Sequence, residues 1–137
     1  IEQFDIGYAV LQFTKLESRS YLWLYRNPEW RLVYMDDKAA IVVKRTPESA
    51  AYLDEHAYQE LSPETATARA DNPQIDPRRA EFDREVLRHV AEVPHSIRAH
   101  YLAAAVHRNA GRSEAYDDER RKILELAAER DITVRLP

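Results

Sequence analysis

The chain has 137 residues, of which 45% are hydrophobic and 32% charged, and its formal net charge is −4. This composition favours a folded chain over a disordered one, and the acidic balance argues against a dedicated nucleic-acid-binding surface. The lack of cysteine excludes disulfides, thiolate nucleophiles and cysteine-ligated metals, and two glycines are too few for a phosphate-binding loop. No apolar run reaches the roughly 18 residues of a membrane span.

The first 45 residues predict a small β-α-β-β unit. Residues 5–13 form a short apolar run typical of a strand buried on both faces. Residues 17–26 carry leucine and tyrosine at near-helical spacing, and this helix is expected to end at Asn27-Pro28, because proline disfavours helical backbone in the residue before it.

Two further strands are predicted at residues 30–34 and 39–43, separated by a polar turn at residues 36–38. So short a separation favours an antiparallel hairpin. The first strand, the helix and the second strand are compatible with a parallel crossover. A three-stranded sheet buries little by itself, so we expect later helices to cover one of its faces.

Composition changes near residues 45–47. Residues 1–45 contain 7 Lys+Arg and 6 Asp+Glu, a net charge of +1, whereas residues 46–137 contain 13 and 18, a net charge of −5. We therefore expect three segments: a β-α-β-β unit at 1–45, a helix and linker at 46–76, and a repeat-like helical unit at 77–137.

Proline, serine and glycine mark the predicted helix ends in this second part. Thr46 and Ser113 are candidate helix caps, Asp76 precedes a proline at a helix start, and Gly111 suits a left-handed position after a helix. The predicted segments are a helix at 46–61, a linker with up to one helical turn at 65–76, helices at 77–93, 96–110 and 113–130, and an extended tail at 132–136.

Residues 99–126 resemble a tetratricopeptide repeat. Small residues Ala103 and Ala104 stand where two helices would cross closely, Gly111 follows the first helix, and Ala115 opens the second. His100 occupies a position where the repeat usually has an aromatic residue. Residues 82–94 resemble the second helix of a preceding repeat. The resemblance implies a protein or peptide partner, held by Arg98, Tyr101, Arg108 and Asn109 on the concave side of the first helix.

Residues 8–45 resemble the soluble C-terminal region of bacterial polytopic membrane proteins related to the C-superfamily glycosyltransferases. The likeness is carried by the strand at 6–11, the Leu- and Tyr-rich helix, N-P-E-W-R-L-V-Y-M-D-D at 27–37 and A-A-I-V-V-K-R at 39–45. In that family this region follows the last membrane helix on the extracytoplasmic side. The family's catalytic acidic residues lie in membrane-helix loops that this segment does not contain, so no catalytic residue is implied here.

Histidines and carboxylates have simpler interpretations than catalysis. His89, His95, His100 and His107 fall within twenty residues, but no two have the i, i+4 spacing of a helical metal site. Glu85 and His89 have that spacing and predict a surface pair. Asp36-Asp37 suits a turn, and residues 117–119 suit the first turn of a helix.

Aromatic residues gather in the first quarter of the chain. Helical geometry separates Tyr21 and Tyr25 from Trp23, so one sheet face cannot bury both sets. Two interpretations stay open for this group, which also includes Trp30 and Tyr34: burial in the core, or a surface for a membrane interface, a sugar or a partner.

The sequence therefore predicts an α+β fold in which a small three-stranded sheet with one crossover helix precedes a tetratricopeptide-like helical hairpin. Because the chain begins at Ile1 without a signal-peptide pattern, we expect it to be a segment of a longer protein. The predicted role is a non-catalytic, extracytoplasmic accessory domain of a larger membrane protein of the lipid-linked-sugar glycosyltransferase type, without cofactor or metal. The alternative is a tetratricopeptide-like adaptor, in the cytoplasm or outside it, that binds a peptide.

Overall fold

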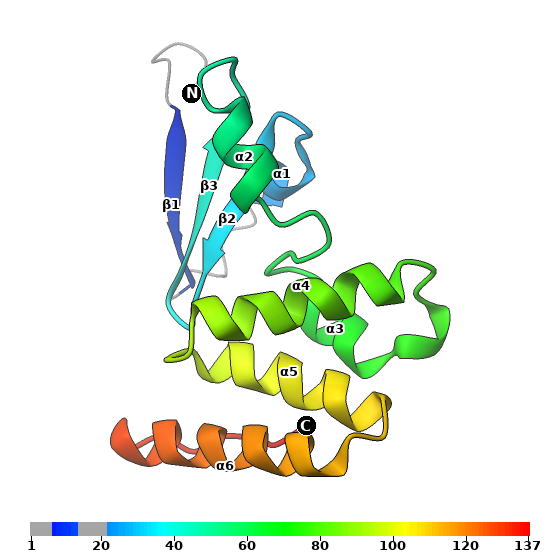
Figure 1. Ribbon diagram of the computed structural model, residues 1–137. Helices are drawn as coiled ribbons and strands as arrows, with labels where there is room; N and C mark the ends of the chain where they lie inside the picture. Colours follow the sequence, from blue (N-terminus) through cyan, green and yellow to red (C-terminus); the bar gives the residue numbers. More distant parts are fainter. Residues whose placement is uncertain (1–6, 14–21) are drawn as a thin grey trace. The chain divides into compact units, whose positions relative to one another are not determined.

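The computed structural model describes residues 7–13 and 22–137 of the chain. It forms two compact units, Ile1–Glu64 and Thr65–Pro137. The first unit contains an antiparallel three-stranded sheet and short helices, and the second is helical (Figure 1). The predicted α+β fold is therefore observed. The predicted middle segment, 46–76, is divided: residues 46–64, with their helix, belong to the first unit and residues 65–76 to the second.

In the first unit the chain order is β1 (Tyr8–Gln12), α1 (Leu22–Arg26), β2 (Trp30–Met35), β3 (Ala39–Lys44) and α2 (Ala50–His56). The predicted hairpin of β2 and β3 is confirmed, and α1 ends before Asn27-Pro28 as expected. Residues 17–21 of the predicted helix lie outside the described residues.

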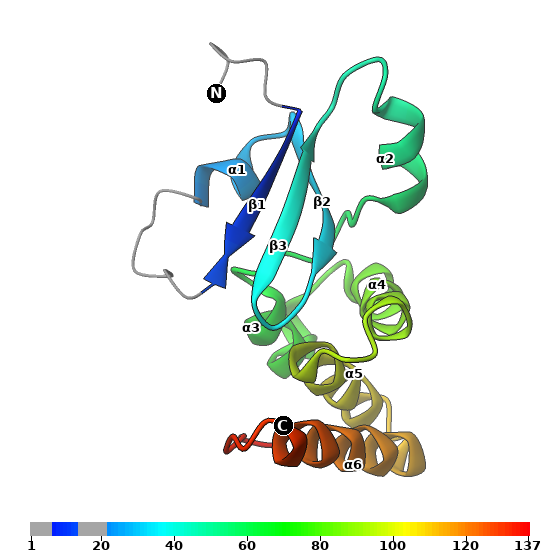
Figure 2. The ribbon, with the colours of Figure 1, turned by 90° about the vertical axis from the view of Figure 1, so that its left-hand side faces the viewer.

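The sheet order is β1-β3-β2, which Figure 2 shows with β3 in the middle. Both neighbouring pairs are antiparallel, so β1 and β2 run in the same direction without being neighbours. The α1 connection from β1 to β2 therefore passes over β3, because the hairpin places β3 between the two parallel strands.

One face of this sheet forms the core of the unit. The buried side chains are Leu11, Trp30, Leu32, Met35, Ala40 and Val42, together with Leu24 of α1 and Leu53 of α2. Both helices pack against β2. The expectation that the first strand is buried on both faces is wrong: Tyr8 and Val10 are 66% and 57% exposed. An edge strand in a half-covered sheet exposes alternate residues.

The turns of this unit follow their local chemistry. Asp36 Oδ1 accepts hydrogen bonds from the backbone N–H groups of Lys38 (2.7 Å) and Ala39 (2.8 Å), which closes the hairpin turn. Thr46 and Ser49 exchange side-chain-to-backbone hydrogen bonds before α2. The helix therefore starts after Ser49 rather than after Thr46, and it ends at His56, earlier than predicted.

The second unit contains α3 (Ala66–Asp71), a short 3-10 helix η4 (Pro73–Ile75), α4 (Arg79–Glu92), α5 (Ile97–Asn109) and α6 (Ser113–Glu129). The linker expected at 65–76 is instead mostly helical. Its Ala66 and Ala70 are buried, so packing stabilises a segment whose polar sequence suggested a loop. Ser113 is the first residue of α6 and makes no capping contact, contrary to the prediction.

Helix α5 is the centre of the second unit and packs against α3, α4 and α6. Its residues 102–106 are all buried, as expected for a helix that is covered on every side. Ala103 and Ala104 have no exposed surface, so the neighbouring helices approach this part of α5 closely. Figure 1 shows α4, α5 and α6 stacked in chain order.

Two helices in this unit end in Schellman motifs. After α5, the N–H groups of Gly111 and Arg112 bond the carbonyls of Arg108 (3.1 Å) and His107 (2.9 Å), and Gly111 has φ of +71°. After α6, the N–H groups of Asp131 and Ile132 bond the carbonyls of Ala128 and Ala127 in the same way. Here the residue with positive φ, +52°, is Asp131 rather than a glycine. The left-handed role predicted for Gly111 is confirmed.

Candidate functional site

Three of the four predicted partner-binding residues meet the C-terminal end of α3. Asn109 Nδ2 donates to the carbonyl oxygen of Ala70 over 2.8 Å, and Arg108 Nη2 lies 3.7 Å from Asp71 Oδ1. Burial raises the pKa of Tyr101, and the negative charge of Asp71 raises it further. Arg98 lies ten residues before Arg108, about 15 Å along the helix axis, and is not part of this group.

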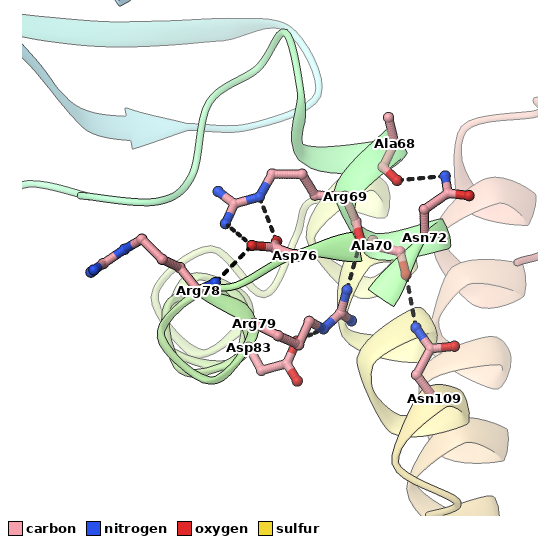
Figure 3. A network of polar contacts seen from close by, with 9 residues as sticks. All are labelled: Ala68, Arg69, Ala70, Asn72, Asp76, Arg78, Arg79, Asp83 and Asn109. Carbon is pink, nitrogen blue, oxygen red and sulfur yellow. Dashed lines mark hydrogen bonds and ion pairs between the residues drawn. The ribbon is translucent and has the colours of Figure 1, made fainter. Parts of the chain in front are cut away.

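Asn109 belongs to a larger network that caps α3 (Figure 3). The last carbonyls of a helix have no partner within the helix, and side chains or water must satisfy them. Three side chains do so here: Asn72 Nδ2 donates to Ala68 O (2.8 Å), Arg79 Nη1 to Arg69 O (2.6 Å) and Asn109 Nδ2 to Ala70 O (2.8 Å). Helices α3, α4 and α5 are thereby joined at one point.

Arg69 and Asp76 form the most buried ion pair of this network. Arg69 Nε lies 2.7 Å from Asp76 Oδ2 and Arg69 Nη2 lies 3.1 Å from Asp76 Oδ1, a two-pronged contact with only 9% of the Asp76 side chain exposed. The Arg69 hydrogen bond lowers the pKa of Asp76. Asp76 also accepts a hydrogen bond from the Arg78 N–H in the turn before α4, but the helix begins at Arg79, two residues later than predicted, so Asp76 is not its cap.

Phe82 and Asp83 of α4 contact the arginine side chains of this network. The guanidinium groups of Arg69 and Arg79 lie 4.5 and 5.3 Å from the centre of the buried Phe82 ring. Arg79 Nε is 2.7 Å from Asp83 Oδ1. Burial raises the pKa of Asp83, and the Arg79 charge opposes that rise. Each charged group here faces an opposite charge, which suits packing of helices better than proton transfer.

His100 joins α5 to α6 and to the preceding loop. Its Nδ1 lies 2.5 Å from Glu119 Oε2 and its Nε2 lies 2.8 Å from the carbonyl oxygen of Pro94. A carboxylate and a carbonyl oxygen can only accept, so both hydrogen bonds form when both ring nitrogens of His100 carry a proton, that is, in its cationic form. Burial alone would lower the pKa of His100, but the hydrogen bonds to Glu119 and Pro94 outweigh it and raise the pKa.

His107 has the opposite character. Arg112 Nε donates to His107 Nδ1 over 2.9 Å, so that nitrogen carries no proton and the imidazole is neutral. Burial and the nearby charge of Arg112 lower the pKa of His107. His89 is fully buried, so the predicted surface pair with Glu85 is wrong. In the described part of the chain, no three His, Asp or Glu side chains converge as metal ligands.

The acidic residues at 117–119 do not lie in the first turn of a helix as expected, because α6 begins at Ser113. Asp117 and Asp118 instead pair with Arg120 and Arg121 along the surface of α6. Glu119 faces α5 and binds His100. Periodicity along one helix could not show this pairing, since it depends on how α5 and α6 pack.

The aromatic residues of the first unit divide between core and surface. Trp30 is buried, Tyr25 and Tyr34 are half-buried, and Trp23 is 45% exposed. Burial raises the pKa of Tyr34 to about 12, helped by its hydrogen bond to Asp36. Tyr21 lies outside the described residues. One aromatic residue of α1 therefore reaches the surface, whereas β2 contributes Trp30 to the core.

Sequence reasoning found Asn109, Arg108 and Tyr101 but missed Arg69 and Arg79. Their only sequence signal was the arginine content around the proline-rich segment 73–77, which was assigned to a linker.

No helix among the described residues is both long and apolar enough to cross a membrane. No protein-family model, curated protein or solved structure matches this chain.

Proposed function

We propose that this chain is a non-catalytic accessory region of a larger membrane protein of the sugar-transfer type. In this proposal it lies on the extracytoplasmic side and supports assembly or binding of a protein partner. Support comes from the resemblance of residues 8–45 to the soluble regions of such proteins. The observation that carries the non-catalytic part is the use of the acid–base groups: Asp76, Asp83 and the His100–Glu119 pair each join helices or helical turns.

The absence of cysteine allows a direct test of location. Leu124 on α6 is 52% exposed and its neighbour Ile123 is fully buried, so Leu124→Cys and Ile123→Cys form a matched pair. Each is placed in the full-length parent protein and treated with a membrane-impermeant maleimide, in intact spheroplasts and after lysis. We expect Leu124→Cys to react in intact spheroplasts and Ile123→Cys to react only after denaturation. Reaction of Leu124→Cys only after lysis would place the region in the cytoplasm and refute the proposal.

A second candidate function is the tetratricopeptide-like adaptor. The observation that favours it is the chemistry at the end of α3, where Arg108 and Asn109 hold a carboxylate and a backbone carbonyl. A peptide ending in an acidic residue offers the same two groups. We expect such a peptide to bind in competition with α3, and Arg108→Ala to abolish this binding. Isothermal titration with an amidated peptide as control measures it, and equal binding of both peptides would exclude this mode.

A further inference from the structure

Alternate residues of β1 direct their backbone N–H and C=O groups away from the rest of the sheet. Phe13 N–H donates to Lys38 O and Lys44 N–H donates to Gly7 O, so the odd-numbered residues of this strand direct their backbone groups toward β3. Backbone groups alternate in direction along an antiparallel strand. The N–H and C=O groups of Tyr8, Val10 and Gln12 therefore face away from β3, along the margin of the sheet seen in Figure 1.

The opposite edge of the sheet, formed by β2, accepts a hydrogen bond from another segment of the same unit. There, the N–H of Tyr58, which follows α2, donates to Leu32 O of β2 over 2.8 Å, and both α1 and α2 pack against that strand. Among the described residues, no hydrogen bond is found to the outer backbone groups of β1. The two edges thus differ: the edge of β2 accepts a hydrogen bond from its own unit, and no residue that the structure describes bonds to the outer edge of β1.

Natural proteins protect edge strands with charged residues, proline or bulges. The sequence of β1 is Tyr-Ala-Val-Leu-Gln, which contains none of these, and its pairing with β3 has a continuous register. Two of its three exposed side chains, Tyr8 and Val10, are large and apolar, and the third is Gln12. A strand with these properties is suited to pairing with another strand.

We propose that β1 pairs with β1 of a second copy of this chain, antiparallel, about a two-fold axis at Val10. This register places Val10 opposite Val10 and Tyr8 opposite Gln12, so all three residues with outward backbone groups exchange hydrogen bonds with their counterparts. The strand has no charge, so its copy brings no like charges into opposition.

In this register, side chains of similar burial lie opposite each other on both faces of the joined sheet. Leu11 of one copy lies opposite Ala9 of the other, which continues the buried face, while Tyr8 and Val10 meet their counterparts on the exposed face. An isologous contact of this kind closes after two copies and leaves no further open β1 edge. The pairing does not depend on the proposed function.

A charge exchange at Val10 tests this pairing. Val10→Lys and Val10→Glu each place two like charges face to face across the axis, whereas a mixture of the two variants places Lys opposite Glu. Sedimentation equilibrium of the 137-residue chain measures association. We expect a dimer for the unaltered chain, about tenfold or greater weakening in each variant alone, and recovery in the mixture. Tyr52→Lys, at a 49%-exposed position on α2, is the control and retains the dimer.

A proline pair separates loss of pairing from loss of folding. Val10→Pro removes an outward N–H and leaves the bonds to β3, whereas Ala9→Pro removes a bond to β3. We expect Val10→Pro to keep the circular dichroism spectrum and lose the dimer, and Ala9→Pro to disturb the sheet itself. A monomeric unaltered chain, a dimer unaffected by Val10→Lys, or a mixture that fails to associate would each overturn the proposal.

Discussion

The contact between His100 and Glu119 makes a quantitative prediction for the helical unit. Only 9% of the His100 side chain and 18% of the Glu119 side chain are exposed, so solvent screens this pair weakly. Glu119→Ala leaves a buried, protonated imidazole nitrogen without an acceptor. Hydrogen bonds to charged groups contribute about 1.5–3 kcal/mol. We therefore expect this variant to lower the free energy of unfolding by about 2 kcal/mol.

A double-mutant cycle isolates the interaction. His100→Phe removes the buried charge and keeps a ring of similar size at this position. In this background Glu119→Ala should cost less than about 0.5 kcal/mol, because no buried donor is left unsatisfied. Glu125→Ala is the control on the same helix: its partner Lys122 is 3.5 Å away and both side chains are about half exposed, so its effect should stay below about 1 kcal/mol.

The same pair predicts a pH dependence. The pKa of His100 is raised above 6.5 in the folded chain, so its protonated form is favoured by folding. Its contribution is complete below pH 6.5 and is lost as pH rises through the folded pKa. His107 does not interfere there, since its lowered pKa affects stability only as pH falls below 6.5.

Urea unfolding of the full chain, followed by far-UV circular dichroism, measures both effects. We expect the free energy of unfolding to decrease from pH 6.5 toward alkaline pH, and the decrease to be smaller in His100→Phe. Identical pH profiles for the two proteins, or equal costs of Glu119→Ala with and without His100, would refute a charged imidazole at this position.

Other predictions concern helix ends and packing. Gly111→Ala should cost about 1–2 kcal/mol, because the backbone is left-handed there although a β-carbon would meet nothing within 4 Å. Asp131→Gly should stabilise the chain by about 0.5–1 kcal/mol for the same reason, and thermal unfolding of both variants measures the opposite signs. Asn109→Ala should cost about 1 kcal/mol through the unpaired Ala70 carbonyl, with Asn109→Asp, which cannot donate, giving no rescue. Phe82→Ala should cost about 3–5 kcal/mol in urea unfolding because the ring is fully buried, and a cost below 1 kcal/mol would contradict its place in the core.

Short-range signals in the sequence predicted much of the secondary structure. Proline after Asn27 marks the end of α1, Asp36 closes the hairpin turn, and Gly111 ends α5. These features depend on a residue and its neighbours within about one helical turn, so no distant contact can change them greatly.

The candidate site could be predicted only in part. Arg108 and Asn109 were found through a likeness in pattern, yet the groups they bind belong to α3, a segment that the sequence suggested was a linker. Its helix is stabilised by burial of Ala66 and Ala70 and by donors from Arg79 and Asn109, which come from other helices. Local propensity contains no information about those partners.

Strand order was likewise decided by the tertiary structure. Apolar runs indicate where strands form, but β1 pairs with β3 and leaves its other edge exposed, a result that depends on contacts between residues more than 25 positions apart. The same holds for His100, whose charge depends on Glu119 in the following helix and on the Pro94 carbonyl. Turns, caps and helix ends are properties of neighbouring residues; edges, buried charges and helix partners arise only when distant segments pack together.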